Sequence, residues 1–257
     1  LVSSDINGAR DVFVHDRVSL STIRASVVDS TINTSGNGFS DQPFIAGDGR
    51  YVAFRSAASN LVVGDLPNIH DIFVRDTLLN RTYLISSDIS VPAVPGNGHS
   101  LTPSLSAEGR YVAFASQATN LVPGDGNGYQ DIFVKDWVSN LIIRVSVQDG
   151  TGAEADGDSF TPFIASSGLY VAFASRATNL VAPLVDDNNY ADIFVTDLNV
   201  LPPYPVSRVS VNFFGDQALN GNSYSPSITA DGRYIVFASD ASNLDVYLPD
   251  LNGYRDI

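Results

Sequence analysis

Short apolar segments, each preceded by a polar turn, recur at regular intervals along the chain. The segment Asp131–Asp136 reads DIFVKD and directly follows the polar turn 125–130. The same pair of turn and segment occurs at 5–16, 65–76 and 186–197, and a partial copy lies at 250–257. Successive copies therefore begin at residues 5, 65, 125, 186 and 250. Such a recurrence indicates a repeat protein, in which each unit is one supersecondary structure.

Each unit contains four segments that are typical of short β-strands. In one copy they read PSLS (103–106), YVAF (111–114), DIFV (131–134) and RVSV (144–147). The second and third segments are apolar without alternation, which predicts strands that are buried on both faces. The fourth segment alternates, with Val145 and Val147 opposite Arg144 and Ser146, which predicts an edge strand partly in contact with water.

The connections between these segments are short, and no segment has the apolar spacing of an amphipathic helix. We therefore expect an all-β protein with antiparallel four-stranded sheets. Four strands in a repeat of about 60 residues, with both faces of each sheet covered, predict the blades of a β-propeller. The chain 1–257 would be one propeller or a propeller segment, with units at 5–64, 65–124, 125–185 and 186–249 and a partial unit at 250–257.

Two arrangements of the units are open. Residues 1–12 and 246–257 occupy the same phase of the repeat, so they would compete for one place in a closed ring of four blades. We therefore favour a piece of a larger propeller over a four-bladed ring with a loose end. In a ring, one blade would combine strands from both ends of the chain.

The repeated residues resemble those of a known family. Gly-Arg-Tyr-Val-Ala-Phe at 109–114, followed by Asp-Ile-Phe-Val-x-Asp at 131–136, resembles the TolB-type, WD-like propeller repeat of bacterial envelope and secreted proteins. The resemblance extends over essentially the whole chain, although the spacing here is longer than is usual in that family. It implies a β-propeller that is extracellular, periplasmic or on the cell surface.

Composition narrows the possible partners and chemistry. The formal net charge of −14 disfavours nucleic acid and anionic membranes as partners, because both require a basic surface. The chain has no cysteine, which excludes disulfides, thiolate metal sites and cysteine nucleophiles. No apolar run reaches the roughly 18 residues of a membrane span. The absence of methionine, even at position 1, and of a basic-then-apolar leader leads us to expect a processed or excised piece.

The polar turn itself is the best candidate for a metal site. Its oxygen-bearing side chains stand at positions i, i+2 and i+6, and calcium binds six to eight oxygens of this kind. An alternative is that Asn-Gly and its flanking carboxylates simply build a hairpin turn. The second copy departs from the pattern through Pro67. The candidate calcium ligands are Asp5, Asn7, Asp11, Asp125, Asn127, Asp131, Asp186, Asn188, Asp192, Asp250, Asn252 and Asp256.

Other polar residues indicate structure more than catalysis. The aspartates that end the DIFV segments (Asp16, Asp76, Asp136 and Asp197) are expected to cap the following turn. His15, His70 and His99 lack the spacing of zinc ligands. The chain also lacks a Gly-x-Ser-x-Gly nucleophile motif and a phosphate-binding glycine loop. We therefore expect this chain not to be an enzyme.

Aromatic residues near the turns are candidates for contact with a partner. Tyrosines recur in or beside the turn of successive units, and aromatic side chains often anchor protein or sugar partners. Alternatively, these rings pack over the turns in which they lie. The candidates are Tyr129, Tyr190, Tyr254 and Trp137.

Three functions are consistent with these observations. The first is a non-catalytic propeller that binds a protein or glycan at its rim or central mouth. The second is a structural or assembly module that forms a homo-oligomer or array, since the units are nearly identical. The third is the propeller domain of a larger hydrolase whose catalytic part lies outside these residues.

Overall fold

The protein is built from short β-strands. The computed structural model describes residues 7–90, 93–181 and 186–245, and in them it contains sixteen strands and no helix. Nowhere in this part of the chain does a helix have the length and hydrophobicity of a membrane span. The strands are β1 Phe13–Asp16, β2 Ser21–Arg24, β3 Ser40–Ile45, β4 Tyr51–Ser56, β5 Asp71–Asp76, β6 Arg81–Leu84, β7 Ser100–Leu105, β8 Tyr111–Ser116, β9 Asp131–Asp136, β10 Leu141–Arg144, β11 Ser159–Ile164, β12 Tyr170–Ser175, β13 Asp192–Asp197, β14 Val206–Arg208, β15 Ser223–Ile228 and β16 Ile235–Ser239.

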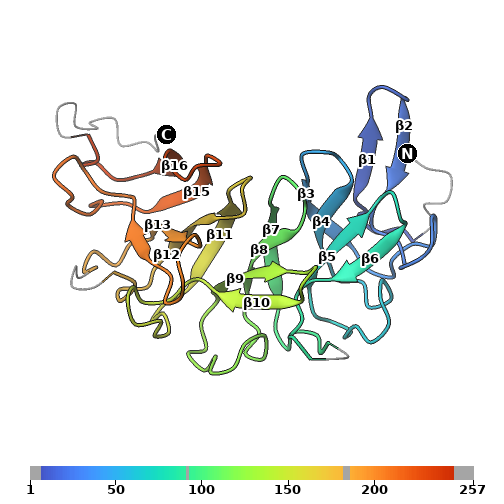
Figure 1. Cartoon of the computed structure of the whole chain (residues 1–257), viewed down its shortest axis with the longest axis horizontal. Coiled ribbons are helices and arrows are strands. Elements are labelled where there is room, and N and C mark those ends of the chain that lie inside the picture. Colours follow the sequence, from blue (N-terminus) through green and yellow to red (C-terminus); the bar gives the residue numbers. More distant parts are fainter. Residues whose placement is uncertain (1–6, 91–92, 182–185, 246–257) are drawn as a thin grey trace.

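The strands form five sheets that lie side by side along an arc (Figure 1). The second, third and fourth sheets are four-stranded antiparallel meanders formed by β3–β6, β7–β10 and β11–β14. The first sheet contains β1 and β2, and the fifth contains β15 and β16. These two sheets lie at opposite ends of the arc (Figure 1). The predicted all-β class and the antiparallel four-stranded sheets are therefore confirmed.

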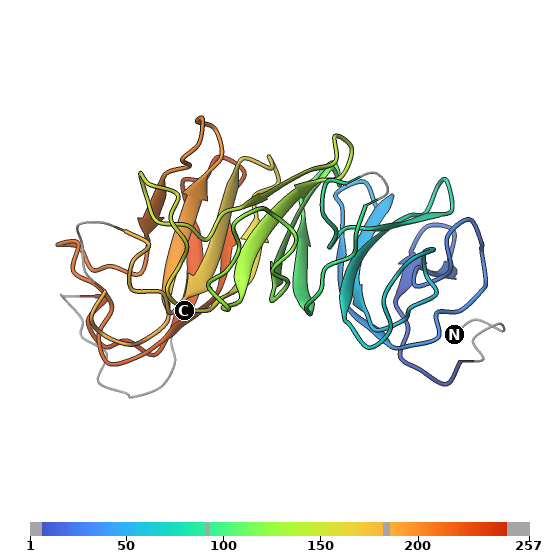
Figure 2. The same ribbon diagram turned by 90° about the horizontal axis from the view of Figure 1, so that it is seen from below.

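Burial of the middle strands follows from the stacking of the sheets. All six residues of β5 and all six of β9 are buried. The view from below shows the sheets packed face to face (Figure 2). The predicted burial on both faces is thus confirmed, because a strand in the middle of a stacked sheet contacts a neighbouring sheet on either side.

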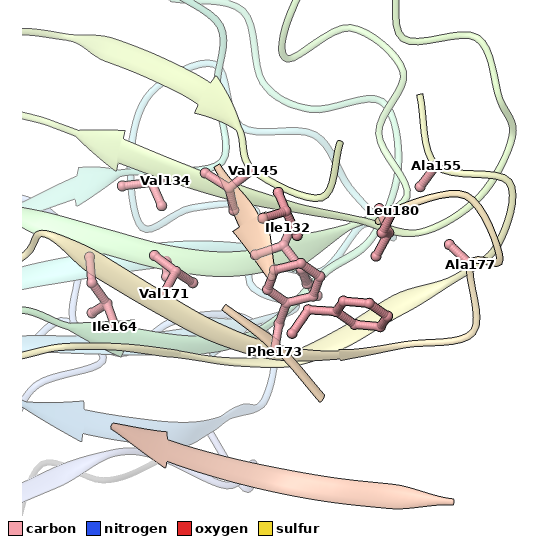
Figure 3. Packing of buried hydrophobic residues seen from close by; sticks show 13 residues of the cluster. Ile132, Val134, Val145, Ala155, Ile164, Val171, Phe173, Ala177 and Leu180 are labelled. Carbon is pink, nitrogen blue, oxygen red and sulfur yellow. The ribbon is translucent and has the colours of Figure 1, made fainter. Parts of the chain in front are cut away.

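Apolar clusters fill the spaces between consecutive sheets. Between the third and fourth sheets, Ile132, Val145, Phe173 and Leu180 are nearly or completely buried and pack together (Figure 3). Within each complete sheet, the middle strands align two phenylalanines, as in the pair Phe114 and Phe133, whose ring centroids are 5.9 Å apart. Three equivalent clusters join the other neighbouring sheets. Each sheet therefore depends on its neighbours for its core.

The predicted fourth strand is wrong in position and in exposure. The strand β10 ends at Arg144, so most of the alternating segment 144–147 lies beyond it. Ser146 and Val145 are completely buried, and the side chain of Arg144 is 9% exposed. Ser146 is turned inward because its hydroxyl donates to Asp131 and accepts from the backbone N–H of Ile132. The fourth strand does lie at an edge of its sheet, as predicted, but the alternation in 144–147 reflects a buried polar network and not contact with water.

The first strand of each complete sheet begins three residues before the proline that marks it in the sequence. In β7 the pairing register shifts between Leu101 and Ser104, and Thr102 has a φ of 49°. This bulge lets the strand continue past Pro103, which cannot donate to a ladder. A strand prediction that starts at the proline therefore misses the bulged residues.

The aspartates at the ends of the third strands cap the following turns, as predicted. Asp76 accepts hydrogen bonds from the backbone N–H groups of Leu78 and Leu79, and Asp136 does the same for Val138 and Ser139. The equivalent residues Asp16 and Asp197 each accept one such bond. In addition, Asp76 and Asp136 receive bidentate hydrogen bonds from Arg50 and Arg110, respectively.

Candidate functional site

Three of the polar turns, those that precede β1, β9 and β13, are held by an asparagine. Asn127 accepts a hydrogen bond from the backbone N–H of Tyr129 at 3.0 Å and donates to Asp131 at 3.0 Å. It also donates to the carbonyl of Ala155. Asn7 and Asn188 make the same three kinds of contact in their own turns. These asparagines therefore form Asx-turns and tie each turn to a neighbouring loop.

An arginine from the fourth strand supplies the positive charge at these turns. Arg144 Nη1 lies 3.1 Å from Asp125, 3.3 Å from Asp131 and 2.8 Å from Glu154. Burial raises the pKa of Asp125 to about 6 despite this arginine. In the first and fourth sheets, Arg24 pairs with Asp11 at 3.2 Å and Arg208 lies 3.6 Å from Asp186. The guanidinium thus stands where a cation would balance the carboxylates.

Calcium binding at these turns remains a prediction. Within residues 7–90, 93–181 and 186–245, no group of three or more acidic or histidine side chains is arranged to hold a metal ion. Five of the proposed site residues lie outside the described residues, namely Asp5, Asp250, Asn252, Tyr254 and Asp256.

The second sheet lacks the arginine. Leu84 stands at the position of Arg144, and Pro67 at the position of Asn127. Asp71 is 1% exposed, and although its Oδ1 accepts a bond from Ser86, its Oδ2 has no hydrogen-bond donor. Burial, followed by the nearby carboxylate of Asp65, raises the pKa of Asp71 to about 8. The two aspartates therefore share a site without a compensating cation.

The proposed aromatic contact residues differ in their surroundings. Tyr129 is 44% exposed and Tyr190 is 36% exposed, each at the surface of its turn. Trp137 instead packs between Tyr51 and Tyr83, with ring centroids 5.5 and 4.8 Å away. Its indole N–H donates to the carbonyl of Gly109 at 2.7 Å. The structure does not bring these three residues together, because they come from different turns and opposite ends of the strands.

A cluster of charged side chains beside the first and second sheets has no equivalent in the other units that the structure describes. Arg55 donates two hydrogen bonds to Asp41, from Nε at 2.8 Å and from Nη2 at 2.7 Å. Arg10 donates to the same carboxylate at 2.9 Å. The side chain of Arg10 is 70% exposed, whereas those of Arg55 and Asp41 are 17% and 14% exposed. Two guanidiniums on one carboxylate leave a net positive charge in an acidic protein.

Aromatic and imidazole rings border this cluster. The guanidinium of Arg55 lies over the ring of Phe39, with its carbon 5.5 Å from the centroid. The ring of Phe39 contacts that of His70 edge-on, and the ring centroids of His70 and His99 are 4.6 Å apart. An open hollow of about 380 Å³ is lined by Arg10, Phe39, Asp41 and Arg55. It lies at the end of the strands where β4 leads into the polar turn.

The electrostatic state of the histidines follows from their contacts. His99 Nδ1 accepts a hydrogen bond from the backbone N–H of His70 at 3.0 Å. The pKa of His70 is lowered by burial first, and then by the nearby His99 and Arg55. His70 is therefore neutral at pH 7, and the arginines carry the positive charge of the hollow.

Sequence reasoning missed this cluster because it searched for what recurs. The signal was present as departures from the repeat. Position 55 is arginine where the other units have Ala115, Ala174 and Ala238. Position 41 is aspartate where they have Leu101, Phe160 and Tyr224. A binding site need be built only once, so such departures mark it better than the shared residues do.

Comparisons with known proteins bear on the fold. No family model and no curated protein matches the chain. The crystal structure of the tricorn protease matches with a TM-score of 0.53 and 11% sequence identity, over 91% of this chain and 22% of that chain. TolB from Acinetobacter baumannii matches with a TM-score of 0.48 and 16% identity, over 91% of this chain and 44% of that chain. The putative TolB from Agrobacterium tumefaciens matches with a TM-score of 0.48 and 15% identity, over 87% of this chain and 60% of that chain.

The chain thus spans between about a fifth and three fifths of the length of these proteins. The match to the tricorn protease, a propeller protein, shows a shared fold and nothing of activity. The expected similarity to TolB-like propeller proteins is confirmed at the level of the fold.

Proposed function

We propose that this protein is a non-catalytic β-propeller scaffold that binds an anionic group of a protein or glycan partner at the hollow formed by Arg10, Phe39, Asp41 and Arg55. One observation carries the proposal: the hollow is built from residues that depart from the repeat, at the end of the strands where the turns cluster. We further propose a location outside the cytoplasm, at the cell surface or in the periplasm, which is supported by the resemblance of the repeated residues to those of bacterial envelope and secreted proteins.

The chemistry of the hollow suits a carboxylate. The planar guanidinium can form two parallel hydrogen bonds to a carboxylate, and it is less strongly hydrated than an ammonium group. Arg55 is held in place by Asp41, so little conformational freedom would be lost on binding. Arg10 also pairs with Asp41, but its side chain is 70% exposed, so its remaining N–H groups face the side from which a ligand would approach. The Phe39 ring offers a flat apolar surface beside both groups.

The test uses the residue that the other units have at this position. Arg55→Ala should keep the fold, since Ala115 and Ala174 occupy the same place in complete sheets. We expect it to weaken binding at least tenfold, with a similar loss for Arg10→Ala. The matched control is Arg176→Ala, an exposed arginine of the fourth sheet, which should bind as the wild type does.

The probes separate the two classes of partner. Binding is measured by calorimetry with uronic-acid oligosaccharides, with acidic peptides and with neutral versions of both. A glycan partner is indicated by binding of the oligosaccharide alone, and a protein partner by binding of the peptide alone. Binding of the neutral probes with equal affinity, or unchanged binding by Arg55→Ala, would contradict the proposal.

A second candidate function, assembly with further copies, is favoured by the two ends of the arc. The first sheet carries strands equivalent to the third and fourth of a complete sheet, and the fifth carries strands equivalent to the first and second. Together they hold the parts of one complete sheet. We infer that β16 of one copy pairs with β1 of another, which would close the blade and extend an array.

Residues on these two edges match the contacts inside complete sheets. Arg233 is equivalent to Arg50 and Arg110, and Asp16 is equivalent to their partners Asp76 and Asp136. In the same register, Phe237 would meet Phe13, as Phe54 meets Phe73 in the second sheet. Tyr234 and Val236 are 61% and 54% exposed, although their equivalents in complete sheets are half-buried or buried. Apolar side chains of this kind at a strand edge would be covered by pairing with another strand.

Engineered cysteines distinguish the possible arrangements, because the chain has none of its own. Val14 and Val236 are equivalent to Val74 and Ala53, which are paired in the second sheet. A variant with both valines replaced by cysteine should form a ladder of disulfide-linked copies on a non-reducing gel. A cross-linked monomer would instead indicate a closed ring, and absence of any cross-link would contradict both. Val63→Cys with Val236→Cys is the control.

A further inference from the structure

A hollow of about 170 Å³ lies between the third and fourth sheets, at the end opposite to the arginine cluster. It opens beside the start of β8 and the end of β9. Its lining is mostly apolar and consists of Tyr111, Val134, Asp136, Leu141, Ile143, Gly168, Leu169, Leu198 and Tyr204.

The equivalent space between the second and third sheets is filled by an indole ring. Trp137 lies there between Tyr51 and Tyr83 and is part of the apolar cluster that joins the two sheets. Its N–H reaches the carbonyl of Gly109, in the turn that connects β7 with β8. The chain itself therefore shows which group fits this kind of space.

The repeat relates the two spaces residue by residue. Leu198 stands at the position of Trp137, and a leucine in place of an indole leaves the hollow unfilled. Tyr111 stands at the position of Tyr51 and keeps one aromatic wall. At the mouth, Leu169 replaces Arg110 and Leu141 replaces Arg81, so two charged positions have become apolar.

The hydrogen-bond acceptor is also retained. Gly168 is equivalent to Gly109, and the two have φ values of 78° and 71°. A Cβ at Gly109 would lie 2.4 Å from Tyr51, and one at Gly168 would lie 2.5 Å from Tyr111. The turn thus packs against the tyrosine in the same way in both places. The carbonyl of Gly168 consequently borders the hollow where the carbonyl of Gly109 receives the indole N–H.

Size and rim agree with an aromatic side chain as the occupant. An enclosed apolar cavity of about 150 Å³ accommodates a benzene ring, so a ring fits here. Leu141 and Leu169 are 55% and 40% exposed at the lining, and Leu201, in the loop between Leu198 and Tyr204, is 88% exposed. An apolar rim of this kind, in a chain of net charge −14, favours contact with a polypeptide over contact with a charged small molecule.

We propose that this hollow binds a tryptophan side chain of a partner polypeptide, with the ring against Tyr111 and the indole N–H donating to the carbonyl of Gly168. The site is separate from the arginine hollow and does not depend on the function proposed for it. It would give the scaffold a second contact, at the opposite end of the strands.

The probe for this site is N-acetyl-tryptophanamide, titrated into the isotopically labelled full chain and followed by NMR. We expect saturable shifts of Tyr111, Leu169 and Leu198, with an affinity at least tenfold higher than that of N-acetyl-leucinamide. Methylation of the indole nitrogen removes the donor and should weaken binding about fivefold, the cost of one ordinary hydrogen bond. Equal affinity for the leucine probe would overturn the proposal.

Variants test whether the hollow is the binding place. Leu198→Trp places an indole in the hollow and should abolish binding of the probe. Leu198→Ala is the control, because it changes the same position without filling the hollow, and it should retain binding. Trp137→Leu opens the equivalent space and should raise the number of sites from one to two. Binding that survives in Leu198→Trp, or that occurs only in Trp137→Leu, would contradict the proposal. Binding of free indole without binding of N-acetyl-tryptophanamide would contradict a polypeptide partner.

Discussion

Arg144 and Asp131 meet across the third sheet, with the guanidinium Nη1 3.3 Å from the carboxylate Oδ2. They lie at the end of β10 and the start of β9, strands that are paired in the sheet. The equivalent residues in the first sheet, Arg24 and Asp11, also form an ion pair. In the second sheet Leu84 takes the place of this arginine and pairs with Phe73, as Arg144 pairs with Phe133, so the carboxylate of Asp71 lacks the counter-charge.

Restoring the arginine should stabilise the protein. We expect Leu84→Arg to raise the free energy of unfolding at pH 7 by about 2 kcal/mol, because an adjacent opposite charge commonly lowers a carboxyl pKa by one to three units. Thermal unfolding monitored by circular dichroism measures the change. Leu84→Met, similar in volume but uncharged, is the control and should unfold near the wild-type temperature. A lower unfolding temperature for Leu84→Arg alone would contradict the prediction.

The same carboxylate should make stability depend on pH. The pKa of Asp71 is raised to about 8 in the folded protein, above its ordinary value of about 3.9 when unfolded. The folded state therefore keeps a proton that the unfolded state releases. This contribution to stability is fully present below about pH 4 and is lost as the pH rises towards 8.

Asp71→Asn removes this titration while keeping an acceptor for the hydroxyl of Ser86. The difference in unfolding free energy between the variant and the wild type should therefore grow in favour of the variant between pH 4 and pH 8. Chemical denaturation at several pH values provides the measurement. Asp48→Asn, at an exposed turn, is the control. A difference that does not vary with pH would show that Asp71 does not titrate in this range.

Removal of the arginine from the polar turn of the third sheet should allow the carboxylates of that turn to bind a cation. Arg144→Met leaves Asp125, Asp131 and Glu154 without their common partner, and such a loss from a buried network commonly costs about 3–5 kcal/mol. We expect millimolar calcium to recover part of this loss in the variant, because carboxylate oxygens are its preferred ligands. Unfolding temperatures are compared in calcium and in chelator.

The wild type serves as the reference for the calcium prediction. An unfolding temperature that is the same in excess calcium and in excess chelator would contradict calcium binding at the turns of the native chain. The result for Arg144→Met does not depend on the result for the wild type, because the variant lacks the guanidinium that occupies the turn in the native chain.

The stacked phenylalanines should account for much of the cohesion between sheets. Phe173 is completely buried between the third and fourth sheets (Figure 3). Phe173→Ala should cost about 3–5 kcal/mol, because the sheets cannot collapse into the resulting cavity. Val63→Ala, at a fully exposed position, should change the unfolding free energy by less than about 0.5 kcal/mol. Equal effects of the two substitutions in urea denaturation would contradict this description of the core.

Much of the fold followed from local pattern. The segments YVAF and DIFV have no polar alternation, and strands of this kind are stable only when both faces are covered. Their regular recurrence, with turns between them, was enough to predict stacked antiparallel sheets. The caps formed by Asp76 and Asp136 were also predictable, because they bond to backbone groups two and three residues away.

The sequence by itself therefore determined the strand type, the repeat and the local turns, because these depend on neighbouring residues. Tertiary structure alone decided which distant side chains meet. His70 contacts His99, and Trp137 fills a space against Tyr51, through the stacking of adjacent sheets. The inward position of Ser146 and the empty space beside Leu198 likewise arise between strands and sheets. Such contacts depend on packing between segments that are far apart in the chain. A local pattern of polar and apolar residues carries no information on which of these segments meet.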